Sequence, residues 1–268
     1  MKFTLKALAL AATTAASTMS FAAAESEHTF SANIAVSSAY VLRGNTASLE
    51  NDNATVSGGI DYEHSSGFYA GYWGSTLGYS LTAQKGWRVP VLDENDEIVG
   101  YKYDYEDGDK AFEHDFYLGY NGSINDDWGY QVGLAYYYYY ESDADVDAFE
   151  SIVGLSYKDF NVTAQTLLED VEWGNAGDTY ILGSYSYALP KDFSLNTSVG
   201  LYYNNDSGKY EYALNTKDDF SFRHVTLGLS KPIGDTGVTA SMDYIIGGKL
   251  RDETDLKNKV VFALSYGF

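Results

Sequence analysis

The chain has 268 residues with 38 acidic and 17 basic side chains, a formal net charge of −21, and no cysteine. So acidic a chain is excluded as a nucleic-acid binder, because affinity for phosphates comes from lysines and arginines that release counterions. An exported form of the chain would have no disulfide to stabilise it. The informative excess is tyrosine, with 26 residues against 26 glycines, and membrane barrels use such aromatic side chains at both interfaces.

The first residues predict a signal peptide. Lys2 and Lys6 precede an uncharged apolar run over residues 7–16, and three alanines end at Ala24, just before Glu25. This is the pattern of a secretory leader with an A-x-A cleavage site, and its apolar run is shorter than the roughly 20 residues of a spanning helix. We therefore expect residues 1–24 to be removed and residues 25–268 to form one domain of 244 residues, with a net charge of −23 once two lysines are lost.

Strand-like alternation then recurs along the chain. Each segment has about nine to eleven residues, the length that a tilted membrane strand requires. The twelve predicted strands are Thr29 to Leu42, Ala54 to Glu63, Phe68 to Leu77, Phe112 to Asn121, Trp128 to Tyr140, Phe149 to Tyr157, Phe160 to Leu168, Thr179 to Tyr187, Phe193 to Tyr203, Phe222 to Ser230, Val238 to Ile246 and Val260 to Phe268.

The last segment is the most telling, because its bulky residues all fall on one face and the chain ends on the aromatic Phe268. A strand with lipid on one side and a lumen on the other has this pattern. Likeness to outer-membrane barrels implies that the barrel-insertion machinery recognises the strand ending at Phe268. The alternative at this point is a strand of a soluble sandwich.

The lengths of the connections favour the membrane barrel. The connections after every second strand are short, and those between them are mostly longer and acidic. Outer-membrane barrels have short periplasmic turns and long outer loops, whereas a soluble meander has no reason for this alternation. We predict an all-β, antiparallel transmembrane barrel of about twelve strands in the outer membrane of a Gram-negative cell, with both termini periplasmic and with lipid and lipopolysaccharide as its surroundings.

Aromatic residues beside the turns predict two girdles at the membrane interfaces. The periplasmic girdle would contain Tyr120, Trp128, Tyr157, Phe160, Tyr187 and Phe193, and the outer girdle Tyr40, Tyr138, Trp173, Tyr180 and Tyr203.

Several short motifs resemble the TorF-type porins, a proteobacterial outer-membrane family. The likeness covers essentially the whole mature chain in order and spacing, although each motif is short. The motifs are Ser38-Ala-Tyr40-Val-Leu-Arg43-Gly44, Gly67-Phe-Tyr-Ala-Gly-Tyr-Trp73, Tyr117-Leu-Gly-Tyr120, the tyrosine-rich stretch Gly133 to Tyr140, and Leu227-Gly-Leu-Ser-Lys231. The resemblance implies a β-barrel with channel activity. The chain departs from it in the segment Leu81 to Lys110, which predicts an enlarged second outer loop.

Strand parity places a set of polar side chains inside the barrel. The predicted pore-lining residues are Arg43, Asp61, Glu113, Asp115, Gln131, Glu150, Gln165, His224 and Asp243. Fixed charge along a narrow aqueous passage concentrates the opposite ion, and these residues include five carboxylates against one arginine. We predict passive passage of small hydrophilic solutes or ions, with cations preferred. The alternative is that the charges pair with one another in a non-conducting surface barrel whose acidic loops bind a partner or stabilise the envelope.

Catalytic and metal-binding patterns are weak, and we predict neither an enzyme nor a cofactor. Of the four histidines only His224 is expected inside the barrel, where a barrel enzyme would need it. The run Asp143, Asp145, Asp147 starts like a calcium loop, but Ala148 and Gly154 stand where glycine and glutamate are required. A solvated acidic loop is the better interpretation, and weak divalent binding or bridging to lipopolysaccharide is the sharper one.

Overall fold

The computed structural model describes residues 26–48, 53–77, 87–92, 98–104, 112–140, 142 and 144–268. The predicted signal peptide lies outside the described residues. In the described part of the chain, no helix is long and apolar enough to cross a membrane.

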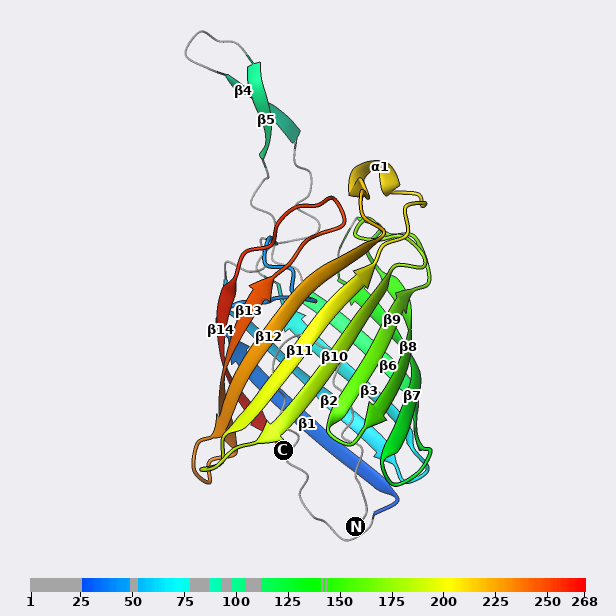
Figure 1. Cartoon of the computed structure of the whole chain (residues 1–268), viewed down its shortest axis with the longest axis vertical. Coiled ribbons are helices and arrows are strands. Elements are labelled where there is room, and N and C mark those ends of the chain that lie inside the picture. The colour runs from blue at the N-terminus through cyan, green and yellow to red at the C-terminus, as the bar shows by residue number, and fades with distance from the viewer. Residues whose placement is uncertain are drawn as a thin grey trace.

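The chain forms a closed antiparallel barrel of twelve strands (Figure 1). Each strand pairs with its neighbours along the chain, and the first pairs with the last, so the sheet has no free edge. The barrel strands are β1 (His28–Ser37), β2 (Thr55–His64), β3 (Phe68–Thr76), β6 (Phe112–Ser123), β7 (Trp128–Tyr139), β8 (Ala148–Tyr157), β9 (Phe160–Leu167), β10 (Thr179–Ala188), β11 (Ser194–Tyr203), β12 (Phe220–Pro232), β13 (Val238–Gly247) and β14 (Lys259–Gly267).

The predicted fold class is confirmed, and two details differ. The first strand ends at Ser37 rather than Leu42. In addition, the segment Leu81 to Lys110 contains a two-stranded sheet, formed by β4 (Trp87–Leu92) and β5 (Ile98–Asp104). This hairpin is separate from the barrel sheet, and the remainder of the segment lies outside the described residues.

The two faces of the sheet differ in polarity as the alternation predicts. On β14, Phe262 and Leu264 are 57% and 52% exposed, whereas Val261 and Ala263, which alternate with them, are buried. The outward face carries large apolar side chains on every barrel strand, and the inward face carries most of the buried polar ones. An apolar exterior around a polar interior suits a barrel in lipid, where a closed sheet also satisfies every backbone hydrogen bond.

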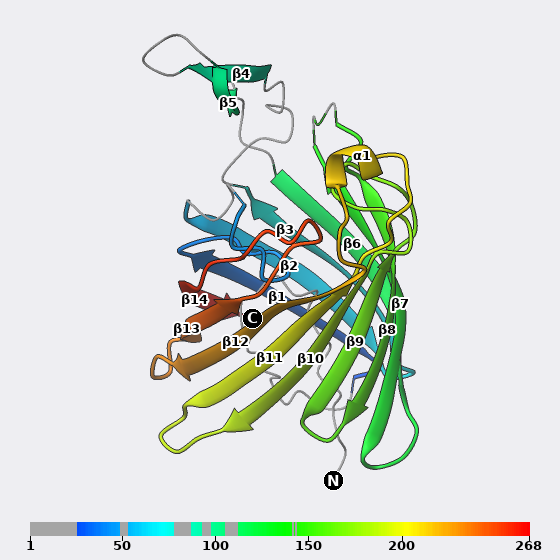
Figure 2. The ribbon, with the colours of Figure 1, turned by 45° about the horizontal axis from the view of Figure 1, so that its top comes forward.

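The two ends of the barrel differ in their connections. At one end lie the short turns, such as residues 65–67 and 158–159, together with the start of β1 and the end of β14 (Figure 1). At the other end lie the longer connections, including the short helix α1 (Glu211–Leu214), as Figure 2 shows with that end turned forward. The predicted alternation of short and long connections is therefore present.

Five of the six aromatic residues predicted at the short-turn end are exposed, and the sixth, Phe193, is half-buried. Tyr120, Trp128, Tyr157, Phe160 and Tyr187 are all exposed, and the Trp128 and Tyr157 rings lie 4.7 Å apart.

The outer girdle is partly wrong. Tyr40 and Tyr180 are buried inside the barrel, and Trp173 packs against a cluster of buried apolar residues that includes Tyr40, Leu77 and Val171. Tyr203 is exposed as predicted.

Candidate functional site in the barrel lumen

The predicted pore-lining residues gather inside the barrel. Asp61 is half-buried, and the other eight side chains are buried: Arg43, Glu113, Asp115, Gln131, Glu150, Gln165, His224 and Asp243. Most of them occupy inward positions of strands, as parity predicts. Arg43 does not, because it lies beyond the end of β1.

The segment of residues 38–48, which we name the inner strap, turns into the lumen after β1. Ala39, Tyr40 and Val41 are 5%, 3% and 3% exposed, so they do not face lipid as a continued strand would require. The Tyr40 hydroxyl lies 2.8 Å from both carboxylate oxygens of Glu113 on β6. This contact anchors one end of the inner strap to the barrel wall.

Arg43 is the main polar anchor of the inner strap. Its Nη2 donates to Glu150 Oε2 at 2.6 Å and also contacts the Gln165 side-chain oxygen at 2.9 Å and the Tyr137 hydroxyl at 3.1 Å. Its guanidinium lies 5.2 Å from the centre of the Tyr180 ring. Arg43 therefore joins β7, β8, β9 and β10 through one side chain, in a geometry that a planar guanidinium suits.

Gly44 brings the backbone of the inner strap against the opposite wall. Its φ is +70°, and a Cβ at this position would lie 2.3 Å from Cδ2 of His224. Only glycine fits such a close approach in the left-handed region without displacement. His224 is held from both sides, since its Nε2 lies 2.7 Å from the Tyr180 hydroxyl and its Nδ1 lies 3.1 Å from Thr226 Oγ1.

These anchors place the inner strap across the lumen. Counted around the ring, β6 and β12 lie opposite each other, six strands apart among twelve. Tyr40 contacts β6 and Gly44 contacts β12, and the four Cα–Cα steps from Tyr40 to Gly44 extend about 14 Å at most. A solute that traverses the barrel has to pass beside this segment.

Arg223 is a lumenal residue that strand parity missed. The ladder pairs Gly200 with His224 and Leu201 with Phe222, so Arg223 is the additional residue of a β-bulge. A bulge re-aims a side chain that would otherwise follow the alternation. The Arg223 guanidinium stacks 4.7 Å over the Tyr202 ring, and within the described residues its Nε and Nη1 have no hydrogen-bond partner.

One lumenal cation, Arg223, lies on the wall opposite Glu113 and Asp115, while the carboxylate of Asp243 lies on the strand next to it. Glu113 and Asp115 lie on β6, and Glu150 lies two strands further on β8. Arg223 lies on β12, across the ring from β6, and Arg43 of the inner strap is ion-paired with Glu150. Such a separation produces an electric field across the lumen.

Three predicted residues lie apart from this network. Gln131 donates to the Tyr69 hydroxyl at 2.9 Å, and Asp61 accepts from the Tyr117 hydroxyl. Asp243 on β13 is buried near Gly228, where a Cβ would meet its Oδ1. These groups belong to the same inward face but make no contact with Arg43.

The longer connections are tied to one another at their end of the barrel. Arg251 pairs with Asp178 at 2.6 Å, and Lys209 pairs with Asp145 at 2.7 Å. Lys209 and the Tyr210 hydroxyl hold the pKa of Asp145 below its usual value through these hydrogen bonds. The sequence predicts a solvated acidic loop here, but Asp145 is ion-paired with Lys209. Its neighbour Asp143 lies outside the described residues.

Comparison with protein families places the chain among bacterial proteins. A family model described as "Bacterial protein of unknown function (Gcw_chp)" matches residues 21–262. The chain belongs to this family. The resemblance to TorF-type porins remains a prediction, since the Gcw_chp model carries no such description. No curated protein matches.

Solved structures share the fold of this Gcw_chp protein. A structure titled "KdgM porin" has a TM-score of 0.51 at 7% identity and covers 89% of this chain and 98% of its own. "NanC porin structure in rhombohedral crystal form" has a TM-score of 0.46 at 11% identity, covering 88% of this chain and 98% of its own. Outer membrane phospholipase A from Escherichia coli has a TM-score of 0.40 at 11% identity and covers 88% of each chain. At these sequence identities the comparisons bear on the fold alone. The likeness of fold is drawn from the KdgM structure, whose TM-score exceeds 0.5.

Proposed function

We propose that this protein is a porin-like channel of the outer membrane, through which small hydrophilic solutes or ions diffuse passively, with cations preferred. The observation that carries the proposal is a closed barrel with an apolar exterior and a charged interior. The likeness of this fold to the KdgM porin supports it. In this arrangement both termini lie in the periplasm, the strand ending at Phe268 is presented to the insertion machinery, and the longer connections face lipopolysaccharide.

The inner strap sets the constriction of this channel. Its residues contact Glu113 on the β6 wall and His224 on the β12 wall, and Arg43 fixes it through the 2.6 Å ion pair with Glu150. Passage then occurs beside the strap, where solutes meet Glu113 and Asp115 on one wall and Arg223 on the other. Five lumenal carboxylates, Asp61, Glu113, Asp115, Glu150 and Asp243, stand against the two arginines Arg43 and Arg223, and this excess supports a preference for cations.

Two variants with opposite charge changes test the selectivity. Asp115→Asn removes one lumenal carboxylate, and Arg223→Gln removes one lumenal cation. We expect the reversal potential under a salt gradient to move toward anions in the first variant and further toward cations in the second. Identical reversal potentials in the wild type and both variants would show that these groups do not line the ion path.

A non-conducting barrel is the second candidate, and the Arg43 network favours it. Arg43 contacts Tyr137, Glu150 and Gln165 at once, so the strap can act as a plug that leaves the longer connections to bind a partner or stabilise the envelope. In that case the wild type would not conduct, and Arg43→Met would open a passage.

We propose no catalytic role for His224. Both of its ring nitrogens are engaged, by Tyr180 and Thr226, and Gly44 covers the ring. We expect the wild type and His224→Gln to give the same rate in lipid and peptide turnover assays. Turnover by the wild type that is lost in His224→Gln would contradict this.

A further inference from the structure

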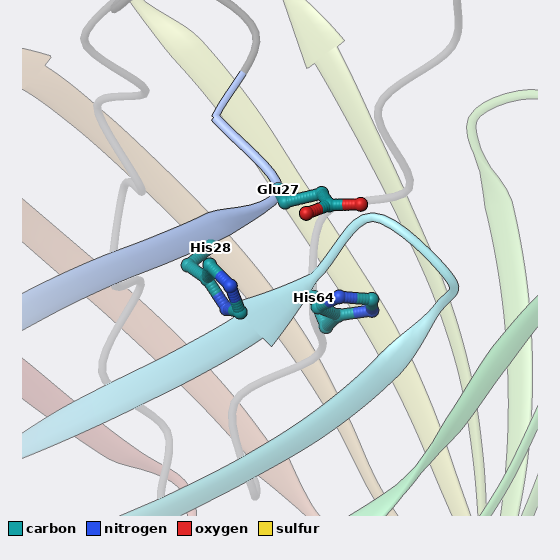
Figure 3. Close-up of side chains that lie close together, drawn as sticks. All are labelled: Glu27, His28 and His64. Atoms are coloured by element: carbon teal, nitrogen blue, oxygen red, sulfur yellow. The ribbon is translucent and has the colours of Figure 1, made fainter.

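A separate group of side chains gathers at the short-turn end of the barrel, far along the strands from the inner strap. Glu27, His28 and His64 each offer one ligand atom, and these atoms all lie within 4.8 Å of one another. Figure 3 shows His28 on β1 and His64 at the end of β2, with the Glu27 carboxylate beside them. Two imidazoles and one carboxylate at this spacing form a set of potential metal ligands.

The strand register brings the two histidines together. His28 of β1 is directly opposite His64 of β2 in the ladder, and directly opposed residues on one face have Cβ atoms about 5 Å apart. The two ring centres lie 5.1 Å apart. Since β1 and β2 are both part of the barrel, this spacing is fixed by the sheet and does not depend on a mobile loop.

Glu27 is held next to this pair by the turn that follows His64. The backbone N–H of Ser65 donates to the carbonyl oxygen of Glu27 at 2.9 Å. Glu27 lies just before the first strand residue, so the alternation of β1 does not force its side chain to the lumenal side. Glu27 and His28 are exposed and His64 is half-buried, which leaves the three groups open to an ion from solution.

Each histidine also has a hydroxyl partner that can orient its ring. His28 Nδ1 lies 2.8 Å from the Tyr62 hydroxyl, and His64 Nδ1 lies 2.8 Å from Ser66 Oγ. In the described part of the chain no hydrogen bond engages either Nε2. Hydrogen bonds to the second nitrogen of a metal-binding imidazole fix its tautomer and raise its basicity. The backbone N–H of Ser66 donates to His64 Nδ1 at 3.1 Å, which requires an unprotonated Nδ1. Ligation of a metal through Nε2 would exchange this hydrogen bond for the one in which Nδ1–H donates to Ser66 Oγ.

This position matters for the barrel because the start of β1 extends past the end of β14. The ladder between these two strands pairs Asn33 to Ser37 of β1 with Ala263 to Gly267 of β14, and Phe268 adds hydrogen bonds to Ala32. Among the described residues, 28–31 therefore pair with β2 alone. A ligand shared by β1 and β2 would hold this overhang in place at the strand pair that closes the barrel.

We propose that Glu27, His28 and His64 bind a transition-metal dication of the Zn²⁺ type, and that the bound ion fixes the overhang of β1 to β2. Two nitrogen ligands and one oxygen ligand suit Zn²⁺, whereas Ca²⁺ and Mg²⁺ require mainly oxygen ligands. Three protein ligands leave further coordination positions for water. The proposal is independent of whether the barrel conducts.

The test is isothermal titration of the folded mature barrel in detergent, without an affinity tag or chelator, with Zn²⁺ and separately with Ca²⁺. We expect one Zn²⁺ site in the wild type and no matching Ca²⁺ site. His28→Ala and His64→Ala should each weaken Zn²⁺ binding by at least about tenfold, as even the loss of a supporting group commonly does. The matched control is His114→Ala. His114 also has a tyrosine hydroxyl on its Nδ1, from Tyr72 at 2.9 Å, but it belongs to no such cluster in the described residues.

Hydrogen exchange of residues 28–31 with and without Zn²⁺ tests the structural consequence. Slower exchange in the wild type, and no change in His64→Ala, would support the proposal. A wild type with no Zn²⁺ site, or His64→Ala with wild-type affinity, would overturn the site. Zn²⁺ binding without slower exchange would overturn the fixing of the overhang. Both histidines are accessible at the barrel rim, so the variants should fold, and equal urea midpoints without metal would verify this.

Discussion

The ion pair between Arg43 and Glu150 offers a direct test of the inner strap. Arg43→Met keeps much of the side-chain stem but removes the guanidinium that lies 2.6 Å from Glu150 Oε2. Glu150 has no exposed surface, so the variant leaves a buried carboxylate with the Tyr137 hydroxyl as its remaining donor. Removing one partner of a buried pair typically costs about 3–5 kcal/mol. Water that enters the lumen would reduce this cost, so we take the range as an upper limit.

The double variant Arg43→Met with Glu150→Gln separates the pair from its surroundings. Glutamine places no charge in the lumen, so the double variant should lose less than the sum of the two single variants. We expect a coupling free energy of about 1–3 kcal/mol, within the range for residues in contact. Urea unfolding of the barrel in lipid vesicles, followed by tryptophan fluorescence, measures each free energy of unfolding.

Conductance provides the second measurement, because a released strap should widen the passage. Arg43→Met should conduct more than the wild type. Arg251→Met is the matched control, since Arg251 also makes a 2.6 Å ion pair, with Asp178, but in the longer connections rather than in the strap. It should destabilise the protein without the same gain in conductance. Two results together would show that the ion pair does not hold the strap. The effects of the two single variants would add within about 0.5 kcal/mol, and Arg43→Met would conduct no more than the wild type.

Two further predictions concern the strap and the longer connections. Gly44→Ala should lower the free energy of unfolding by about 1–2 kcal/mol for the left-handed backbone alone. Displacement of His224, whose Cδ2 would lie 2.3 Å from the new Cβ, adds to this loss. Adding His224→Ala to Gly44→Ala should recover part of the loss in urea unfolding, and no recovery would argue against the contact. Hydrogen bonds from Lys209 and Tyr210 keep the pKa of Asp145 below its ordinary 3.8, so their contribution is complete above that pH and is lost as the pH falls through the lowered value. A spin label at Ser207→Cys should become more mobile over this acidic range, and Asp145→Asn should remove the pH response.

The alternation of apolar and polar residues was sufficient to predict the barrel, because one face of each strand must be apolar and the connections alternate in length. It could not locate the end of β1. Tyr40 continues the pattern that Ile34 and Val36 begin, and an aromatic residue suits both a lipid interface and a packed lumen. The difference arises from contacts with Glu113 and Glu150, which are remote in sequence.

Strand parity predicted most of the lumenal side chains but not Arg223. One extra residue in β12 shifts the alternation, and the sequence has no local signal for this bulge. The pairing of His28 with His64 depends on the register of two strands, which spacing along the chain does not reveal. The sequence alone therefore does not indicate that the two histidines meet.

Planar-bilayer conductance of the refolded mature chain under a salt gradient decides whether this barrel is a channel. We expect discrete conductance steps with a cation-selective reversal potential. A barrel that is folded and inserted, as shown by protease protection, and yet gives no steps would contradict the channel function.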